Sequence, residues 1–233
     1  MLITENREGS ACNYHRIELP LSRMTVAPKV PTLLVNRVCS WSGVKLHKHK
    51  LDGGRIIVDL DDHFVLPDTH HLAESYRKSG MVERSIALLG LADVVTVTTD
   101  YLAEQVRHYV KSGFVAVLPN ALPFDEGQFA MSRDRHSGTP IVWAGGSSHE
   151  HDLQLMRGTF DSRRLTLGGY QRTAPWFNMV QTFPGCRVKE ARPLDSYMDL
   201  YEGHKFALAP LERNAFTQCK SNLKVLEAGA KGL

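Results

Sequence analysis

The chain lacks the short motifs that identify several common classes of protein. Its four cysteines are widely spaced and form no Cys-x-x-Cys, so a structural zinc site of the usual kind is not expected. No run of about 18 apolar residues could span a membrane, and the polar N-terminus does not resemble a signal peptide. We therefore expect a cytoplasmic protein whose cysteines are free thiols.

Several catalytic signatures are absent as well. The sequence contains no Gly-x-Ser-x-Gly, no Walker loop and no Gly-x-Gly-x-x-Gly. The stretch His149-Glu150-His151-Asp152 is not the His-Glu-x-x-His of metalloproteases, because histidines two positions apart do not share a helix face. The 28 basic and 25 acidic residues leave a net charge of +3, which is too balanced to indicate a nucleic-acid binder.

What the sequence does contain is an α/β pattern. The 233 residues, 42% of them hydrophobic, are enough for two domains of about 100–130 residues. Short β-branched runs alternate with helical periodicity, which predicts βαβ units and parallel sheets. A polar stretch with proline and glycine at 120–139 predicts a linker. We expect α/β domains at 1–128 and 129–233. The expected strands are 32–35, 55–60, 93–98, 114–118, 141–144, 163–167 and 206–211, and the expected helices include 81–91, 149–156, 195–201 and 221–231.

The strand end around Gly145 is the first candidate ligand site. A strand that ends in Gly145 and Gly146 lets a ligand approach the backbone, and the start of a following helix favours phosphate. Ser147, His149 and Asp152 add polar groups around the same turn. We expect these residues to bind a phosphate-containing ligand, although glycines at such turns also occur for purely steric reasons.

The second candidate is a helix face near the end of the sequence. Lys220, Lys224 and Glu227 are spaced i, i+4 and i+7, which predicts that one helix face holds all three. The amines could meet phosphate, and the carboxylate could accept from ribose hydroxyls, as a sugar nucleotide requires. The alternative, which is the commoner meaning of this spacing, is an exposed helix face with salt bridges.

Two polar clusters in the first half are further candidate ligand sites. Asp59-Leu60-Asp61-Asp62 ends an expected strand, where α/β proteins bind ligands. Asp-x-Asp could also hold a divalent cation, but a polar strand exit is the more frequent meaning. Tyr14 and Arg16 belong to a basic cluster that could face an acceptor or a phosphate. We take His15 and Asp62 as the candidate catalytic residues and expect no metal.

Four segments, in this order, resemble the GT-B glycosyltransferases, near the retaining set called glycosyl transferases group one. The first is an early loop with Tyr14, Arg16 and a proline, and the last is the helix that contains Lys220-Ser221-Asn222-Leu223-Lys224. The resemblance extends over nearly the whole chain, because these segments run from its beginning to its end. The segments are 13–20, 92–99 with 117–121, 143–153 and 209–232.

The resemblance implies two Rossmann-like domains, with a nucleotide sugar bound mainly by the second and the acceptor by the first. Gly145, Gly146 and Lys220 would then lie against the diphosphate, Glu227 would hold the ribose, and no metal or other cofactor would be needed. The implied partners are a UDP- or GDP-sugar and a hydroxyl acceptor, which could be a glycan, a lipid carrier, a protein or a modified nucleic acid. An oligomer is also possible.

The sequence departs from the family pattern in two ways. The family has paired glutamates eight positions apart, but the position eight before Glu227 is Cys219. Family members also extend beyond Gly232, so we expect an incomplete second domain. Two hypotheses therefore stand beside a glycosyltransferase. One is a truncated, inactive relative that binds a nucleotide or a partner chain, and the other is an epimerase of the same architecture.

Overall fold

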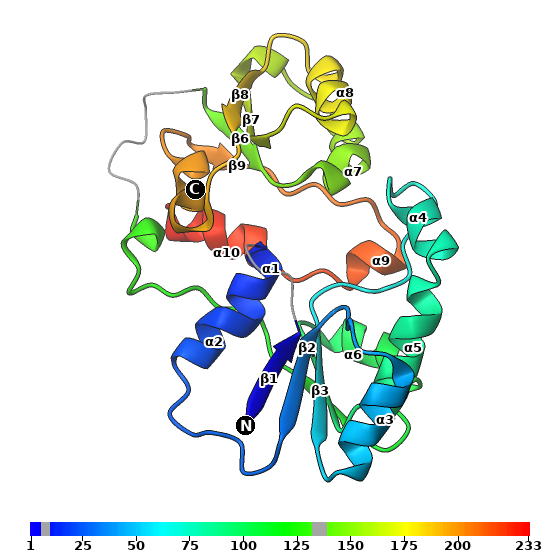
Figure 1. The fold of residues 1–233 in the computed structure, drawn as a ribbon. Helices are drawn as coiled ribbons and strands as arrows, with labels where there is room; N and C mark the ends of the chain where they lie inside the picture. The colour runs from blue at the N-terminus through cyan, green and yellow to red at the C-terminus, as the bar shows by residue number, and fades with distance from the viewer. Residues whose placement is uncertain (6–9, 132–138) are drawn as a thin grey trace. The chain divides into compact units, whose positions relative to one another are not determined.

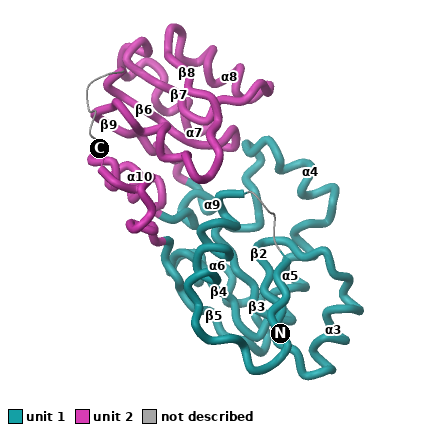
Figure 2. The backbone as a smooth tube through the Cα atoms, turned by 60° about the vertical axis from the view of Figure 1, so that its left-hand side comes forward, with its two compact units in different colours: residues 1–120, 214–221 teal, residues 121–213, 222–233 magenta. Residues whose placement is uncertain are grey.

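The chain forms two compact units, each with its own parallel sheet (Figures 1 and 2). The structure, a computed structural model, describes residues 1–5, 10–131 and 139–233. Unit 1 comprises residues 1–120 and 214–221, and unit 2 comprises residues 121–213 and 222–233. Within the described residues, no helix has both the length and the apolar character needed to cross a membrane.

Unit 1 is built on a five-stranded parallel sheet with the order β1-β2-β3-β4-β5. Its strands are β1 (Leu2–Glu5), β2 (Thr32–Asn36), β3 (Arg55–Leu60), β4 (Val94–Val97) and β5 (Phe114–Val117). Its helical segments are α1 (Ala11–Asn13), the π-helical turn η1 (Tyr14–Glu18), α2 (Leu19–Ser22), α3 (Gly43–Leu51), α4 (Ala73–Lys78), α5 (Met81–Leu91), α6 (Asp100–Arg107) and α9 (Ala215–Gln218).

One face of this sheet forms the core of unit 1. Val35, Val58 and Val95 lie side by side in register on neighbouring strands and are at most 1% exposed. α5 and α6 cover this face with apolar residues such as Leu89 and Leu102. β-branched residues such as these valines favour a parallel sheet that is buried under helices. A sheet packed in this way holds the polar residues at its carboxyl end in fixed positions.

Unit 2 contains a four-stranded parallel sheet with the order β8-β7-β6-β9. Its strands are β6 (Ile141–Ala144), β7 (Leu165–Tyr170), β8 (Arg187–Glu190) and β9 (Phe206–Ala207). Its helices are α7 (Glu150–Gln154), α8 (Ala174–Thr182) and α10 (Leu223–Ala230), together with the 3-10 turns η2 (Gly127–Phe129), η3 (Ser147–His149), η4 (Ser162–Arg164) and η5 (Leu194–Tyr201).

Unit 2 departs from the sequence-based expectation in detail. β8 and α8 were not expected, and the strand expected at 206–211 pairs with β6 only through Phe206 and Ala207. α8 buries Trp176 and Met179 in the same cluster as Trp143 of β6. The apolar runs in the sequence did not predict α8, which carries aromatic residues, or β8, which is a charged strand at the edge of the sheet.

The expected fold class, α/β with two parallel sheets, is confirmed. The units, however, do not divide at residue 128. Leu122 and Phe129 pack with Met198 in a core of unit 2, so the chain joins that unit from Ala121 onward. The side chain of Cys219 is fully buried in the core of unit 1. The segment Asn214–Ser221 therefore belongs to unit 1, although it lies deep in the second half of the sequence.

Candidate functional site

In unit 2, the carboxyl end of β6 forms a tight turn against α10. The Lys224 ammonium donates to the carbonyl oxygen of Ala144. A Cβ on Gly145 would lie 2.6 Å from Lys224 Nζ, so glycine at this position lets the lysine reach the strand end. Gly169 has a φ of +100°, and a Cβ there would lie 2.5 Å from the carbonyl oxygen of Gly145. Gly145 and Gly169 are therefore required for packing.

Gly146 is in a different situation from Gly145. It is exposed, and the nearest atom to a Cβ added there would be Ser148 Oγ, at 4.0 Å. Its φ of −97° is accessible to any residue. The space beside Gly146 is therefore open to a ligand, one residue along the chain from the Lys224 contact.

A histidine–aspartate pair lies at the same turn. His149 Nδ1 is 2.7 Å from Asp152 Oδ2, and the His149 ring meets Trp143 edge to face at a centroid distance of 6.1 Å. The other oxygen of Asp152 accepts from the backbone N–H of Glu212 at 2.7 Å. A carboxylate on Nδ1 fixes the tautomer and the orientation of an imidazole. The structure thus holds His149 in one orientation beside the turn.

Glu227 is buried on α10, one helical turn beyond Lys224. Its side chain accepts from the Tyr201 hydroxyl at 2.9 Å, and the residue is 4% exposed. Burial raises the pKa of Glu227, although Lys224 and the Tyr201 hydrogen bond oppose the rise. The alternative of a solvated helix face is therefore wrong for this residue, because its carboxylate faces a buried tyrosine.

Most of the expected donor-side residues lie around this one turn in unit 2. They are Gly145, Gly146, Ser147, His149, Asp152 and Lys224, with Glu227 on the same helix as Lys224. Lys220 is not among them. The expectation that Lys220 shares their helix face is wrong, because α10 begins at Leu223 and Lys220 belongs to unit 1.

In unit 1, Arg16 is a structural anchor at the carboxyl end of the sheet. Its guanidinium binds the Asp59 carboxylate with an Nη2–Oδ1 distance of 2.6 Å, and Nη1 donates to the carbonyl oxygen of Leu118 at 2.6 Å. Asp59 also accepts from Asn36 Nδ2 at 3.0 Å and from Thr96 Oγ1 at 2.6 Å. Both charged side chains are at most 6% exposed. Arg16 therefore fixes η1 to β3 and to the segment that follows β5, and its guanidinium is occupied by these contacts.

Asp62 lies between two cations of unit 1. Arg37 Nη2 is 2.9 Å from Asp62 Oδ2, and Lys220 Nζ is 3.1 Å from Asp62 Oδ1. Arg37 also binds Asp61, and its guanidinium holds the pKa of Asp61 below its usual range even though burial opposes this. Arg37 itself has a φ of 61°, and no other described non-glycine residue has a positive φ. A strained backbone position thus supports this carboxylate cluster.

Tyr14 and His15 lie on η1, and their rings meet edge to face at a centroid distance of 5.0 Å.

The Asp-x-Asp cluster at Asp59–Asp62 does not have the geometry of a cation site, because its carboxylates are bound to guanidinium and ammonium groups. Across the part of the chain that the structure describes, no three His, Cys, Asp or Glu side chains are arranged to hold a metal.

Sequence reasoning missed four residues of these two clusters. They are Arg37, Asn36, Trp143 and Tyr201. Asn36 had a signal, since it is polar and follows a buried apolar run at the carboxyl end of a strand. Arg37, Trp143 and Tyr201 had none, because an arginine in a loop and aromatic residues in apolar runs are common in any α/β protein.

The structure resembles that of a sucrose-phosphate synthase from Thermosynechococcus elongatus. The TM-score is 0.51 at 14% sequence identity, over 73% of this chain and 47% of that one. The fold is of the GT-B kind. This likeness confirms the expected GT-B architecture, and at this identity it bears on the fold alone. No protein-family model and no curated protein sequence matches the chain.

Two other solved structures match less closely, each with a TM-score of 0.38. A UDP-glucosyltransferase from Polygonum tinctorium is 10% identical, over 91% of this chain and 57% of that one. A glycosylation-associated protein of the Gap123 complex from Streptococcus agalactiae is 15% identical, over 86% and 42% respectively. The chain thus spans about half the length of the proteins that it resembles.

Proposed function

We propose that unit 2 binds a nucleoside-diphosphate sugar at the carboxyl end of β6, and that the chain transfers the sugar to a hydroxyl acceptor. The observation that carries this proposal is the position of Lys224. Its ammonium lies against the strand end beside Gly145, and the next residue, Gly146, leaves space for a ligand. The carboxyl ends of the strands are where open α/β sheets bind ligands, and a diphosphate needs a cation there.

Sugar transfer requires that the donor and the acceptor are positioned and that the charge on the leaving diphosphate is stabilised. As the glycosidic bond to the diphosphate breaks, negative charge grows on the phosphate oxygens and the sugar becomes oxocarbenium-like. Lys224 would stabilise that charge, and the oriented imidazole of His149 would supply a second polar contact. Glu227, buried beside Tyr201, would accept from ribose hydroxyls once it exchanges its present hydrogen bond. Tyr14, His15 and Asp62 of unit 1 are the residues that we assign to the acceptor.

Cys219 favours a second candidate, a nucleotide-binding protein without transferase activity. It occupies the position at which the glycosyltransferases that the sequence resembles have the first of their paired glutamates. Its side chain is fully buried in the core of unit 1. A thiol in that environment cannot contact the donor sugar. Binding of a nucleoside diphosphate without transfer or hydrolysis of any donor would support this candidate.

The proposal is tested by ligand binding to two lysine variants of unit 2. Lys224→Ala should weaken binding of UDP or GDP by about tenfold to a hundredfold, as expected for a charge-assisted contact, and should affect the bare nucleoside far less. Lys205→Ala is the matched control, because Lys205 is an exposed lysine of the same unit. Titration calorimetry measures both, and thermal unfolding checks that each variant is folded.

Two results would overturn the proposal. One is a wild-type chain whose melting temperature no nucleoside diphosphate or diphospho-sugar raises at millimolar concentration. The other is equal diphosphate affinity of the Lys224→Ala and Lys205→Ala variants. Product analysis with a binding donor then separates transfer to an acceptor from epimerisation, which needs no acceptor, and from binding alone.

A further inference from the structure

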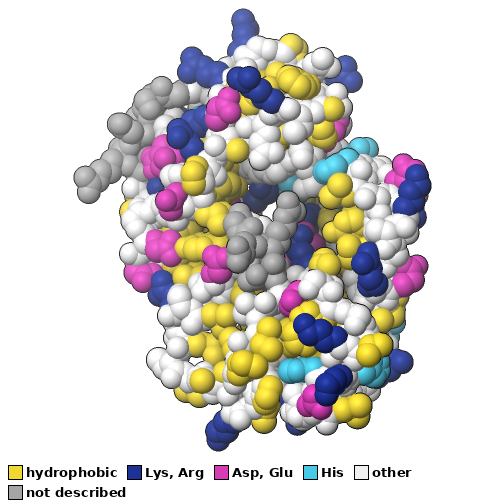
Figure 3. Space-filling model, viewed as in Figure 1, with side chains coloured by type: hydrophobic (Ala, Val, Ile, Leu, Met, Phe, Trp, Pro, Cys, Tyr) yellow, Lys and Arg dark blue, Asp and Glu magenta, His cyan; other side chains and the backbone are white. Residues whose placement is uncertain are grey.

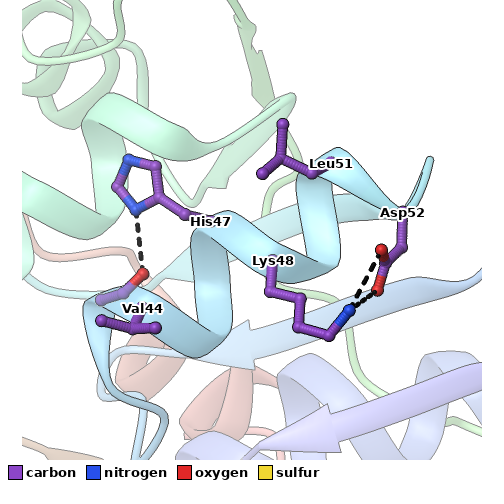
Figure 4. A pocket seen from close by; sticks show the side chains of 6 residues that line it. Val44, His47, Lys48, Leu51 and Asp52 are labelled. Atoms are coloured by element: carbon purple, nitrogen blue, oxygen red, sulfur yellow. Dashed lines mark hydrogen bonds and ion pairs between the residues drawn. The ribbon is translucent and has the colours of Figure 1, made fainter.

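α3 exposes apolar side chains that the described residues of unit 1 leave uncovered. Val44 is 81% exposed and Leu51 is 87% exposed, and these are the most exposed large hydrophobic residues in the described chain. Their i, i+7 spacing places them on one face of the helix with His47 and Lys48 between them (Figure 4). Leu46 is the residue of α3 that packs into the core. The outer face is therefore apolar at both ends and polar in the middle.

The same helix is basic. Residues 43–51 contain three lysines and two histidines but no acidic residue. Lys48 pairs with Asp52 at 2.9 Å, but both side chains are more than 60% exposed, so the pair is weak and can be exchanged. Lys45 lies 3.6 Å from the ring centroid of Trp41. Figure 3 shows lysine, histidine and hydrophobic side chains intermingled over the position of α3 in Figure 1.

Acidic groups of the surrounding elements compensate part of the positive charge of α3. Lys50 points toward the sheet and pairs with Asp93 at 2.6 Å, and Arg55 binds the same carboxylate. Glu5 of β1 accepts from Trp41 Nε1 at 2.9 Å. Asp93 is therefore occupied in holding the inner side of the helix. Against burial, hydrogen bonds from Ser40 and Trp41 and the charge of Lys45 lower the pKa of Glu5, so this carboxylate lies near Lys45 at the start of the helix. Among the described residues, Asp52 lies at the outer face beside Lys48.

We propose that α3 docks on an anionic lipid surface. Val44 and Leu51 would enter the boundary between headgroups and acyl chains, while Lys45 and Lys48 would meet lipid phosphates or carboxylates. The protein would lie on the membrane without spanning it. This proposal is independent of the sugar-transfer function, because α3 belongs to unit 1 and none of its residues is assigned to donor or acceptor.

The shape of the surface favours lipid over a protein or nucleic-acid partner. A protein partner of stable affinity needs a broad patch of closely packed apolar residues, whereas this face offers two protruding side chains about two helical turns apart. A nucleic acid would gain little from exposed valine and leucine. A fluid lipid surface accommodates separate apolar side chains and adds electrostatic attraction to each lysine.

The test is co-sedimentation of the full chain with vesicles of phosphatidylcholine alone and of phosphatidylcholine with phosphatidylserine. Wild type should bind the anionic vesicles, and raising the salt concentration should weaken binding because it screens the lysines. The double variant Val44→Ser/Leu51→Ser should lose about tenfold in partition coefficient. Lys45→Gln/Lys48→Gln should lose about as much and remove most of the salt dependence.

Matched substitutions elsewhere on the surface are the controls. Val26→Ser/Leu155→Ser removes two exposed apolar side chains, and Lys29→Gln/Lys111→Gln removes two exposed lysines. Both should bind vesicles as wild type does. No binding by wild type at low salt would overturn the proposal. Undiminished binding by Val44→Ser/Leu51→Ser, or equal binding to neutral and anionic vesicles, would do so as well.

Discussion

Lys220 and Asp62 are 158 positions apart in the sequence, yet Lys220 Nζ lies 3.1 Å from Asp62 Oδ1 in unit 1. The side chains are 16% and 23% exposed, so the pair is sheltered from water without being fully buried. The ammonium also lies 4.7 Å from the ring centroid of Phe216, which is itself buried in the same unit. This lysine therefore positions a carboxylate of unit 1, whereas Lys224, four residues later, serves the turn in unit 2.

The two lysines should separate in experiment. Lys220→Ala should lower the free energy of unfolding by about 1 kcal/mol, the order expected for a partly exposed pair, and should leave the affinity for UDP or GDP unchanged. A double-mutant cycle with Asp62→Asn in urea unfolding measures the coupling of the pair. If Lys220→Ala weakened diphosphate binding as much as Lys224→Ala, Lys220 would belong to the donor site after all.

Gly146→Ala should distinguish space reserved for a ligand from space required for packing. The added Cβ has 4.0 Å of clearance, so we expect the melting temperature to stay within a few degrees of wild type. A diphosphate that approaches this backbone would meet the new methyl group, and calorimetry should show an affinity loss of about tenfold. Gly145→Ala is the contrasting variant, since its Cβ would meet Lys224 and Trp143 and should lower stability. Unchanged diphosphate affinity in Gly146→Ala would place the ligand elsewhere.

The buried carboxylate of Glu227 should make stability depend on pH. Burial raises its pKa in the folded state, so the folded protein retains a proton that the unfolded chain has already lost. This residue's contribution therefore becomes less favourable as pH rises from the unfolded pKa through the raised folded value. Glu227→Gln does not titrate, so its stability relative to wild type should improve between about pH 5 and about pH 8.

Urea unfolding of wild type and Glu227→Gln at both pH values measures this difference. The control is Glu190→Gln, because Glu190 is exposed on β8 and its carboxylate keeps its contact with water in both states. A Glu227→Gln difference that does not change with pH would show that the carboxylate is not desolvated in the folded protein.

Arg16→Ala should strongly destabilise unit 1. It leaves the Asp59 carboxylate buried with only the uncharged donors Asn36 and Thr96, and breaking a buried ion pair in this way costs about 3–5 kcal/mol. Arg16→Lys should recover only part of this loss, because an ammonium cannot reproduce the fork of contacts to Asp59 and Leu118. Arg55→Ala is the control, since that arginine is 62% exposed and its pair should contribute less than about 1 kcal/mol. Equal losses in Arg16→Ala and Arg55→Ala would contradict the anchoring role.

Local sequence patterns predicted the framework well. The expected strands at 55–60 and 141–144 and the helix at 81–91 have the bounds of β3, β6 and α5. These are runs in which β-branched content or a single apolar stripe decides the structure before any tertiary contact forms. β8 (Arg187–Glu190) was missed because it is an edge strand with charged residues at three of its four positions, which local patterns do not distinguish from a loop.

The candidate site was predictable only as far as its parts are local. The turn at Gly145 and Gly146 and the His149–Asp152 pair lie within eight residues, and the structure brings them together. Helical spacing also predicted that Lys224 and Glu227 lie on one helix, but it wrongly extended this helix back to Lys220. The side chain of Lys220 is held by Asp62, which lies more than 150 positions earlier in the sequence. Local periodicity cannot predict a contact between residues so far apart.

Because residues 214–221 complete unit 1, a nascent chain cannot finish folding this unit when its first 120 residues leave the ribosome. Until Cys219 arrives, its place in the core stays unfilled, and an unfilled core position costs stability. The Thr99–Cys219 and Asn120–Ser221 hydrogen bonds must likewise wait until residues 219 and 221 have been synthesised. Because these contacts join distant parts of the sequence, we expect them to slow the folding of unit 1. They also mean that a single proteolytic cut anywhere between residues 121 and 213 cannot release unit 1 as one polypeptide.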